Sequence, residues 1–188
     1  MNRQGFSLEL AAYGERWRTE HERVARFTEL IALWPACLLR DHFPGHITAS
    51  GWVVHPPSDA VLLTHHRKLD KWLQLGGHVD GEDDLIGAAR REVLEESGVA
   101  GVTHVVSGGA IFDMDIHPIP AHRREPAHEH FDVRFAFAAP ERIRPRVSDE
   151  SHDVAWVPLD ELERFTTEES MLRMRRKWRA LSAVDPVE

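Results

Sequence analysis

Apolar residues recur at two different spacings along the chain, and the spacing changes near residue 43. Within residues 20–33 apolar side chains lie three or four positions apart, which predicts an amphipathic helix that ends before Pro35. From residue 46 onward apolar and polar residues alternate, which is typical of strands. We expect strands over residues 47–54, 59–66, 72–78, 108–117, 129–139 and 154–159.

Three further helices are predicted among and after these strands, over residues 84–97, 158–165 and 168–180. Gly98 stands at the usual position for ending the first of them. Strands and helices mix without strict alternation, which favours an α+β fold with a mixed β-sheet and helices on its faces. We therefore divide the chain into an N-terminal helical extension, residues 1–43, and a folded domain, residues 44–188.

Composition narrows the range of partners. The chain has 188 residues, 42% of them apolar and 29% charged, as expected for a globular domain. Its net charge of −8 argues against a nucleic-acid polymer as partner, because such proteins usually carry a basic face. The basic residues within 173–179 fit a solvated helix face. A small anionic ligand remains compatible with this charge if a cation screens it.

The compartment is indicated by cysteine usage and by the apolar runs. Cys37 is the single cysteine, so the chain suits a reducing compartment, and we expect a cytoplasmic protein. The longest apolar run, residues 30–39, has Pro35 inside it and is too short to cross a bilayer. No membrane partner is expected.

Three glutamates crowd one face of the predicted helix 84–97. Glu92, Glu95 and Glu96 are three and four positions apart or adjacent, and like charges at such spacings cost a helix a few tenths of a kcal/mol, roughly. Either solvent screens these carboxylates or a cation lies between them. Magnesium prefers oxygen ligands and is commonly bound by one or two carboxylates together with substrate phosphates.

The surrounding stretch, GGHVDGEDDLIGAARREVLEESGV at residues 76–99, resembles the Nudix box. The residues that match the fixed positions at its end are Arg91, Glu92, Val93, Glu95, Glu96, Gly98 and Val99. The order of predicted strands and the segment AWVPLDEL, residues 155–162, are also similar to the Nudix fold. The resemblance covers about residues 46–165 and implies an α/β/α sandwich, with the N-terminal helices outside it.

This resemblance implies hydrolysis of a nucleoside diphosphate linked to another moiety, at the pyrophosphate. It implies Mg²⁺, or Mn²⁺ in its place, held by Glu92, Glu95 and Glu96 and by a backbone carbonyl of Gly76 or Gly77. Two or more such ions would neutralise the diphosphate, polarise a phosphoryl oxygen and lower the pKa of an attacking water. Arg91 belongs to the same implied catalytic set.

For two roles in the implied site the sequence offers more than one residue. The family pattern has a glutamate eight residues before the arginine, but here that residue is Asp83, and Glu82 precedes it. Either side chain can support the metal site and Arg91, and we include Glu82 among the metal-site candidates. The general base in this family is often a glutamate outside the box. We favour Glu150, which precedes the last strand, over Glu125 and Glu129.

A second polar cluster follows from the alternation along two neighbouring strands. Its members are Asp113, Asp115 and His117 on one strand and His128, His130, Asp132 and Arg134 on the next. Pairing of the two strands would place both sets on one face of the sheet. That face is either an ordinary solvent face or a substrate site formed by Asp113, Asp115, His117, His128 and His130. It is also a candidate for a second metal, because imidazole suits Zn²⁺ and Ni²⁺. His65 and His66 either join it or simply end a strand.

Two other functions compete with a small-molecule pyrophosphohydrolase. An isoprenoid diphosphate isomerase of the same fold uses an active-site cysteine, but Cys37 lies outside the region of resemblance. A ligand-sensing module without activity usually loses box glutamates, and this chain keeps three. On the N-terminal helices, Trp17 and Trp34 either pack on the domain or form a homodimer interface.

Overall fold

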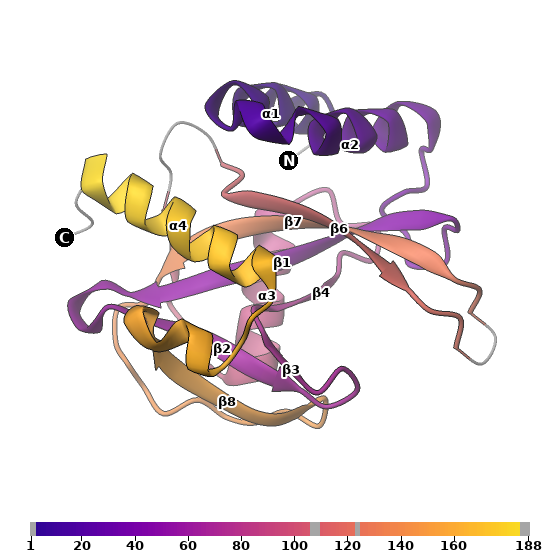
Figure 1. The fold of residues 1–188 in the computed structure, drawn as a ribbon. Coiled ribbons are helices and arrows are strands. Elements are labelled where there is room, and N and C mark those ends of the chain that lie inside the picture. Colours follow the sequence, from indigo (N-terminus) through magenta and orange to yellow (C-terminus); the bar gives the residue numbers. More distant parts are fainter. Residues whose placement is uncertain (1–2, 106–109, 123–124, 185–188) are drawn as a thin grey trace.

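The computed structural model describes residues 3–105, 110–122 and 125–184, and one mixed β-sheet forms its centre (Figure 1). The strands are β1 (Gly45–His55), β2 (Ala60–His66), β3 (Lys71–Leu73), β4 (Leu75–His78), β5 (Thr103–His104), β6 (Asp113–Ile119), β7 (His128–Ala138) and β8 (Ser151–Pro158). Their order is β3-β2-β1-β7-β5, with β4 beside β1, β6 beside β7 and β8 beside β2. The pair β1–β7 is parallel and the other pairs are antiparallel, which confirms the expected mixed sheet.

Helices cover both faces of this sheet. The α-helices are α1 (Arg3–Arg16), α2 (His21–Leu33), α3 (Leu85–Ser97) and α4 (Glu169–Val184), and the short 3₁₀ helices are η1 (Arg18–Glu20), η2 (Pro56–Ser58) and η3 (Leu159–Arg164). In Figure 1, α4 crosses in front of the sheet, α3 lies behind it, and α1 and α2 run as a pair above β6 and β7. None of the helices in the described part of the chain combines the length and the apolar character needed to cross a membrane.

Three predicted elements differ from the structure. The strand expected over residues 72–78 is two strands, because β3 pairs with β2 whereas β4 pairs with β1. The strand expected over residues 108–117 begins at Asp113, and residues 108 and 109 lie outside the described ranges. The helix expected over residues 158–165 is the 3₁₀ helix η3.

Alternation along β1 divides the core into two layers. On one face, a Cβ atom at Gly51 would lie 2.6 Å from Val93 Cγ2, so α3 packs directly on the strand backbone there. On the other face, Trp52 belongs to a buried cluster with Met174 and Trp178 of α4. The sheet therefore separates α3 from α4, and polar groups on its two faces meet different helices.

The N-terminal helices share the core of the sheet. Phe6, Leu10 and Phe27 belong to the same buried cluster as the strand residues that face α3. The ring of Phe27 meets that of Phe131 edge to face, with 5.2 Å between centroids. Trp17 packs partly buried against this cluster, whereas Trp34 is 45% exposed.

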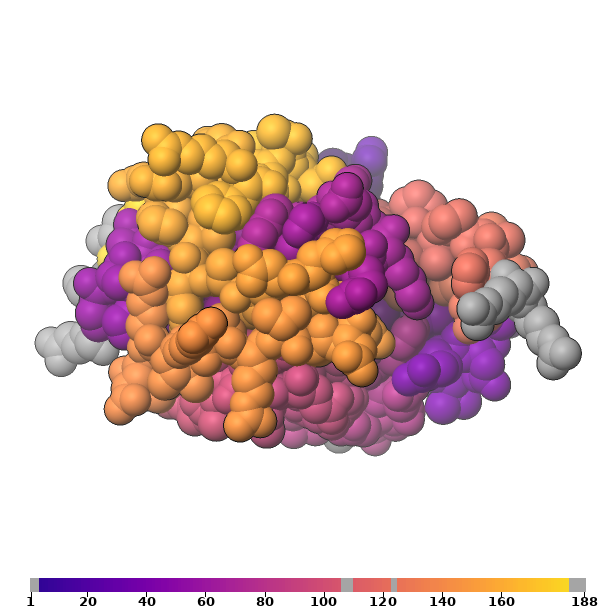
Figure 2. Space-filling model, turned by 90° about the horizontal axis from the view of Figure 1, so that it is seen from below, coloured from indigo at the N-terminus to yellow at the C-terminus, as the bar shows by residue number. Residues whose placement is uncertain are grey.

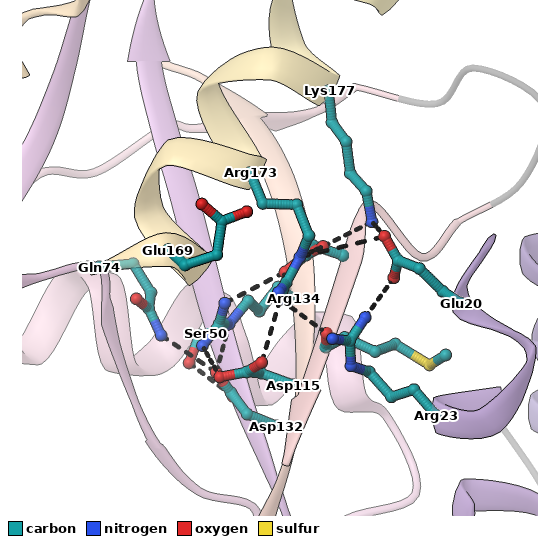
Figure 3. Close-up of polar contacts among 12 residues, drawn as sticks. Glu20, Arg23, Ser50, Gln74, Asp115, Asp132, Arg134, Glu169, Arg173 and Lys177 are labelled. Carbon is teal, nitrogen blue, oxygen red and sulfur yellow. Dashed lines mark hydrogen bonds and ion pairs between the residues drawn. The ribbon is translucent and has the colours of Figure 1, made fainter. Parts of the chain in front are cut away.

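A buried ionic network joins α4 and the N-terminal helices to the sheet (Figure 3). Asp113 of β6 is fully buried, and its carboxylate contacts Arg134 at 3.1 Å, Arg173 at 2.8 Å and Lys177 at 2.6 Å. Lys177 also contacts Glu20 at 2.7 Å. The interpretation of residues 173–179 as a solvated face is therefore wrong for Arg173 and Lys177, which lie four positions apart on the inner face of α4.

We expect Asp113→Asn to lower the free energy of unfolding by about 3–5 kcal/mol, because it removes the anion shared by three buried cations. Urea unfolding measures the change. The matched control is Glu169→Gln, which breaks an exposed ion pair between Glu169 and Arg176, both on α4. That change should cost less than about 1 kcal/mol. Equal losses in the two variants would contradict a stabilising role for the network.

Candidate active site

Helix α3 carries the glutamates to one edge of β4. Its apolar stripe, which includes Ala88, Ala89 and Val93, is buried against the sheet and fixes the rotation of the helix. The helix ends at Gly98, which has a left-handed φ of 71° and donates its N–H to the carbonyl of Leu94. This confirms the expected helix end.

Two carboxylates of α3 lie directly against the backbone of the paired glycines. Glu96 is 9% exposed, and its Oε2 accepts a hydrogen bond from the N–H of Gly76 at 3.0 Å. A Cβ atom at Gly77 would lie 2.6 Å from Oε2 of Glu92, so the absence of a side chain lets this carboxylate approach the strand. The structure therefore brings Glu92 and Glu96 beside Gly76 and Gly77.

Arg91 ties the helix to the preceding loop and strand. Its guanidinium donates to Glu92 at 2.6 Å, to Glu82 at 3.2 Å and to the carbonyl of His78 at 3.0 Å. Glu95, with a side chain 60% exposed, lies 3.6 Å away. Of the two candidates for the first box glutamate, Glu82 is in contact with Arg91. Asp83 lines a small pocket beside α1 and α2.

The site is short of positive charge. Burial, together with the neighbouring charges of Glu92, Glu150 and Glu95, raises the pKa of Glu96 to about 8, although the Gly76 N–H opposes the shift. Burial also raises the pKa of Glu92, against the effect of Arg91. A divalent cation would relieve this repulsion, and oxygen donors are the ligands that Mg²⁺ prefers. The donor set thus fits such an ion.

Glu150 lies close enough to act on this cluster electrostatically. Its charge raises the pKa of both Glu92 and Glu96. It lies in the turn before β8, where its carbonyl accepts the N–H of Arg67 at 2.8 Å. In Figure 2 the orange part of the chain, which includes β8, lies between the pink region of α3 at the bottom and the yellow region of α4 at the top. By contrast, Glu129 forms an ion pair with Arg26 of α2.

The two polar stripes pair as expected, but α4 covers half of them. The register of β6 and β7 sets Asp113 opposite Arg134, Asp115 opposite Asp132 and His117 opposite His130. Three of these residues are at most 2% exposed: Asp113, Asp132 and Arg134. The interpretation as a solvent face is wrong for this end, because its charges belong to the network beneath α4. At the other end His117 and His130 are half-buried, whereas His128 is 7% exposed.

Two further histidines, which the alternation along β6 and β7 does not predict, lie beside His117, His128 and His130. His46 of β1 stands beside His130 in the parallel register, and their ring centroids are 4.8 Å apart. The ring of His78 of β4 lies 5.3 Å from that of His130. Alternation would have placed His46 on this face only if the parallel pairing of β1 and β7 had been known. His65 stacks instead on Trp72.

Burial keeps these imidazoles neutral. Burial, together with the neighbouring histidines, lowers the pKa of His46 to about 4 and that of His130 to about 3. Burial likewise lowers the pKa of His78 and of His117. The cluster therefore presents nitrogen lone pairs, not positive charge, at neutral pH.

Comparison with known proteins identifies the family to which the chain belongs. A model of the family described as NUDIX domain matches residues 45–178. Among solved structures, the chain is similar to the dihydroneopterin triphosphate pyrophosphohydrolase of E. coli, with 18% identity, a TM-score of 0.58, and 70% of this chain and 93% of that chain covered. It is also similar to the Nudix hydrolase RenU of M. smegmatis, with 19% identity, a TM-score of 0.56, and coverage of 78% and 91%.

A third solved structure is the Ap4A hydrolase of C. elegans, with 18% identity, a TM-score of 0.51, and coverage of 73% and 98%. At these identities the similarity shows a shared fold. No curated protein matches the sequence.

We expect Glu96→Gln to stabilise the metal-free protein at alkaline pH. The folded-state pKa of about 8 lies above the ordinary value of 4.5, so the stability present below pH 4.5 is lost as the pH rises through 8. Glutamine keeps an oxygen that can accept from Gly76 but has no charge to bury. Thermal unfolding in chelator should show the variant above wild type at pH 9, by an amount of the order of a few kcal/mol, and equal to it near pH 4.

Glu95→Gln is the matched control, because it removes a charge from the exposed side of the same helix. If Glu96→Gln loses stability with rising pH as steeply as wild type does, Glu96 is not the group that titrates.

Proposed function

Since this chain belongs to the Nudix hydrolase family, we propose that it hydrolyses the pyrophosphate bond of a nucleoside diphosphate linked to another moiety, with Mg²⁺ or Mn²⁺ as the metal. The observation that carries the proposal is the placement of Glu92 and Glu96. Both carboxylates lie against the backbone of the glycine pair, where burial and mutual repulsion make a cation favourable. A small molecule that carries a diphosphate is the substrate class that suits such a site.

Each residue of the site has a proposed role. Glu92, Glu95 and Glu96 hold the metal together with a backbone carbonyl of Gly76 or Gly77. Bound divalent ions neutralise the diphosphate and lower the pKa of the attacking water. Arg91 positions the ligands, since it contacts Glu92 and the His78 carbonyl. Glu82 in turn orients Arg91.

Glu150 is the proposed general base. Its charge acts on Glu92 and Glu96 from a different element, the turn before β8, and it is exposed. A base must reach the water that attacks phosphorus while remaining outside the group of metal ligands. Glu150 would accept that proton and release it to solvent.

The rest of the substrate is proposed to lie along the histidine-lined end of the stripes. His117, His128, His130 and Asp115 remain candidates there. We leave Asp113 out, because it is fully buried and bonded to three cations. An isomerase role is less well supported, because Cys37 is 2% exposed and belongs to the apolar core cluster.

The substrate class is tested with a panel of diphosphate-containing nucleotides. The panel comprises dinucleoside polyphosphates, nucleotide sugars, oxidised nucleotides and capped RNA ends, and phosphate is measured after phosphatase treatment with Mg²⁺ and with Mn²⁺. We expect at least one member to be cleaved and Glu96→Gln to lower kcat by at least about 100-fold, since a metal ligand is lost. Glu161→Gln, which breaks an exposed pair with Arg164, should leave the rate unchanged.

Cleavage of no member by wild type, or a normal rate in Glu96→Gln at saturating Mg²⁺, would refute the proposal.

We expect Glu150→Gln to lower kcat by about 10²–10⁴-fold, the usual contribution of a general base. The metal requirement and KM should stay close to the wild-type values, and the rate should lose its rise on the acid side of the pH profile. Asp149→Asn is the matched control, because it removes the charge from the adjacent residue of the same turn. Should both variants keep the wild-type pH profile, another group accepts the proton.

A further inference from the structure

Three imidazoles from three different strands converge on one point of the sheet. His46 of β1, His78 of β4 and His130 of β7 each offer a ring nitrogen, and these atoms all lie within 4.8 Å of one another. The convergence follows from pairing: β1 runs between β4 and β7, so side chains of equal alternation from all three strands share a face. The cluster thus rests on the rigid centre of the sheet and not on loops.

His46 is oriented as metal-binding histidines are. Its Nδ1 lies 3.3 Å from the backbone carbonyl of His42 and donates to it, which leaves Nε2 as the atom with the free lone pair. Nε2 is buried and has no hydrogen-bond partner among the described residues. A backbone carbonyl behind one nitrogen and an available second nitrogen is the usual arrangement around a metal-ligating imidazole.

The two partners are more open than His46. His46 is 1% exposed, whereas His78 and His130 are half-buried, so an ion can reach the cluster from their side. His128 borders the cluster, with its ring 5.0 Å from that of His46, and its Nδ1 is engaged by the carbonyl of Pro126 at 2.9 Å. The walls of the cluster are therefore imidazole, a donor that suits zinc, nickel and cobalt better than magnesium.

We propose that His46, His78 and His130 bind a divalent transition-metal ion of the zinc class, at a site distinct from the carboxylates of α3. Three imidazoles and one open position form a coordination set that zinc commonly adopts. Zinc–nitrogen bonds of about 2.0–2.1 Å require nitrogens about 3.4 Å apart, so His78 and His130 would close slightly on the fixed His46.

The proposal differs from the metal site of the proposed hydrolase in ligand chemistry and in position. The carboxylates are hard oxygen donors and lie on the α3 side of β4, whereas the imidazoles lie on the opposite face. The two sites can therefore be tested separately, and the second does not depend on the first.

The test uses untagged, chelator-treated protein with Mg²⁺ in excess, so that added histidines are absent and oxygen sites are filled. Co²⁺ is titrated in, and the visible absorption that reports its coordination is followed. Zn²⁺ is then added as a competitor. We expect one equivalent of Co²⁺ per chain with the absorption of nitrogen-bound cobalt, displaced by Zn²⁺.

Four variants locate the ion. His130→Gln and His78→Gln should each weaken Co²⁺ binding by at least about 100-fold, since a ligand is lost. His65→Gln is the matched control, because that histidine is on the sheet outside the cluster and should keep wild-type affinity. Glu96→Gln should also keep it, whatever its hydrolytic activity.

The outcomes that overturn the proposal are clear-cut. If wild type binds Co²⁺ no more tightly than His130→Gln and His78→Gln, the histidines do not form a metal site. If Glu96→Gln abolishes the absorption, the ion lies at the carboxylates instead. Circular dichroism of each variant checks that lost binding is not lost folding, and His78→Gln, on a different strand, gives a second reading if His130→Gln is unfolded.

Discussion

The parallel pairing of β1 with β7 is the constraint on which the other features depend. It joins strands that are far apart in the sequence, and its register runs from Gly45 opposite Glu129 to Val54 opposite Ala138. On one face of the sheet, this pair forms the apolar surface against which α3 packs. On the other it sets Thr48 and Ser50 beside Asp132, to which they donate hydrogen bonds at 3.1 and 2.7 Å. A shift by one residue would exchange these faces and bury the histidines and acids under α3.

Three polar clusters at this sheet contain buried groups whose pKa values are shifted in different directions. Around Asp113 three cations outweigh the cost of burial, and the pKa of that carboxyl is lowered well below its ordinary value. At Glu96 burial and neighbouring acids prevail over one N–H donor, and the pKa is raised to about 8. The histidines remain neutral, and burial lowers their pKa values. The first cluster is internally balanced, whereas the other two offer carboxylate oxygen and nitrogen lone pairs respectively.

Features with local signals could be predicted from the sequence, and features that depend on distant pairing could not. The spacing of Glu92 and Glu96, the helix end at Gly98 and the alternating stripes of β6 and β7 all follow from neighbouring residues, and each was expected. The membership of His46 and His78 in the histidine cluster depends on β1 lying between β4 and β7, which no local pattern reveals. The burial of Asp113 likewise depends on which face of α4 meets the sheet.

Strand β4 separates the two candidate metal sites and contacts both. Its Gly76 N–H donates to Glu96, its His78 carbonyl accepts from Arg91, and the His78 side chain enters the histidine cluster. A Cβ atom at Gly76 would lie 2.2 Å from Oγ of Ser50, and one at Gly77 would lie 2.6 Å from Glu92. Each glycine is therefore required for a different reason. A side chain at Gly76 would collide with Ser50, and a side chain at Gly77 would collide with the carboxylate of Glu92. A displacement of β4 would change the geometry of Glu96 and of His78 together, because one short strand holds both.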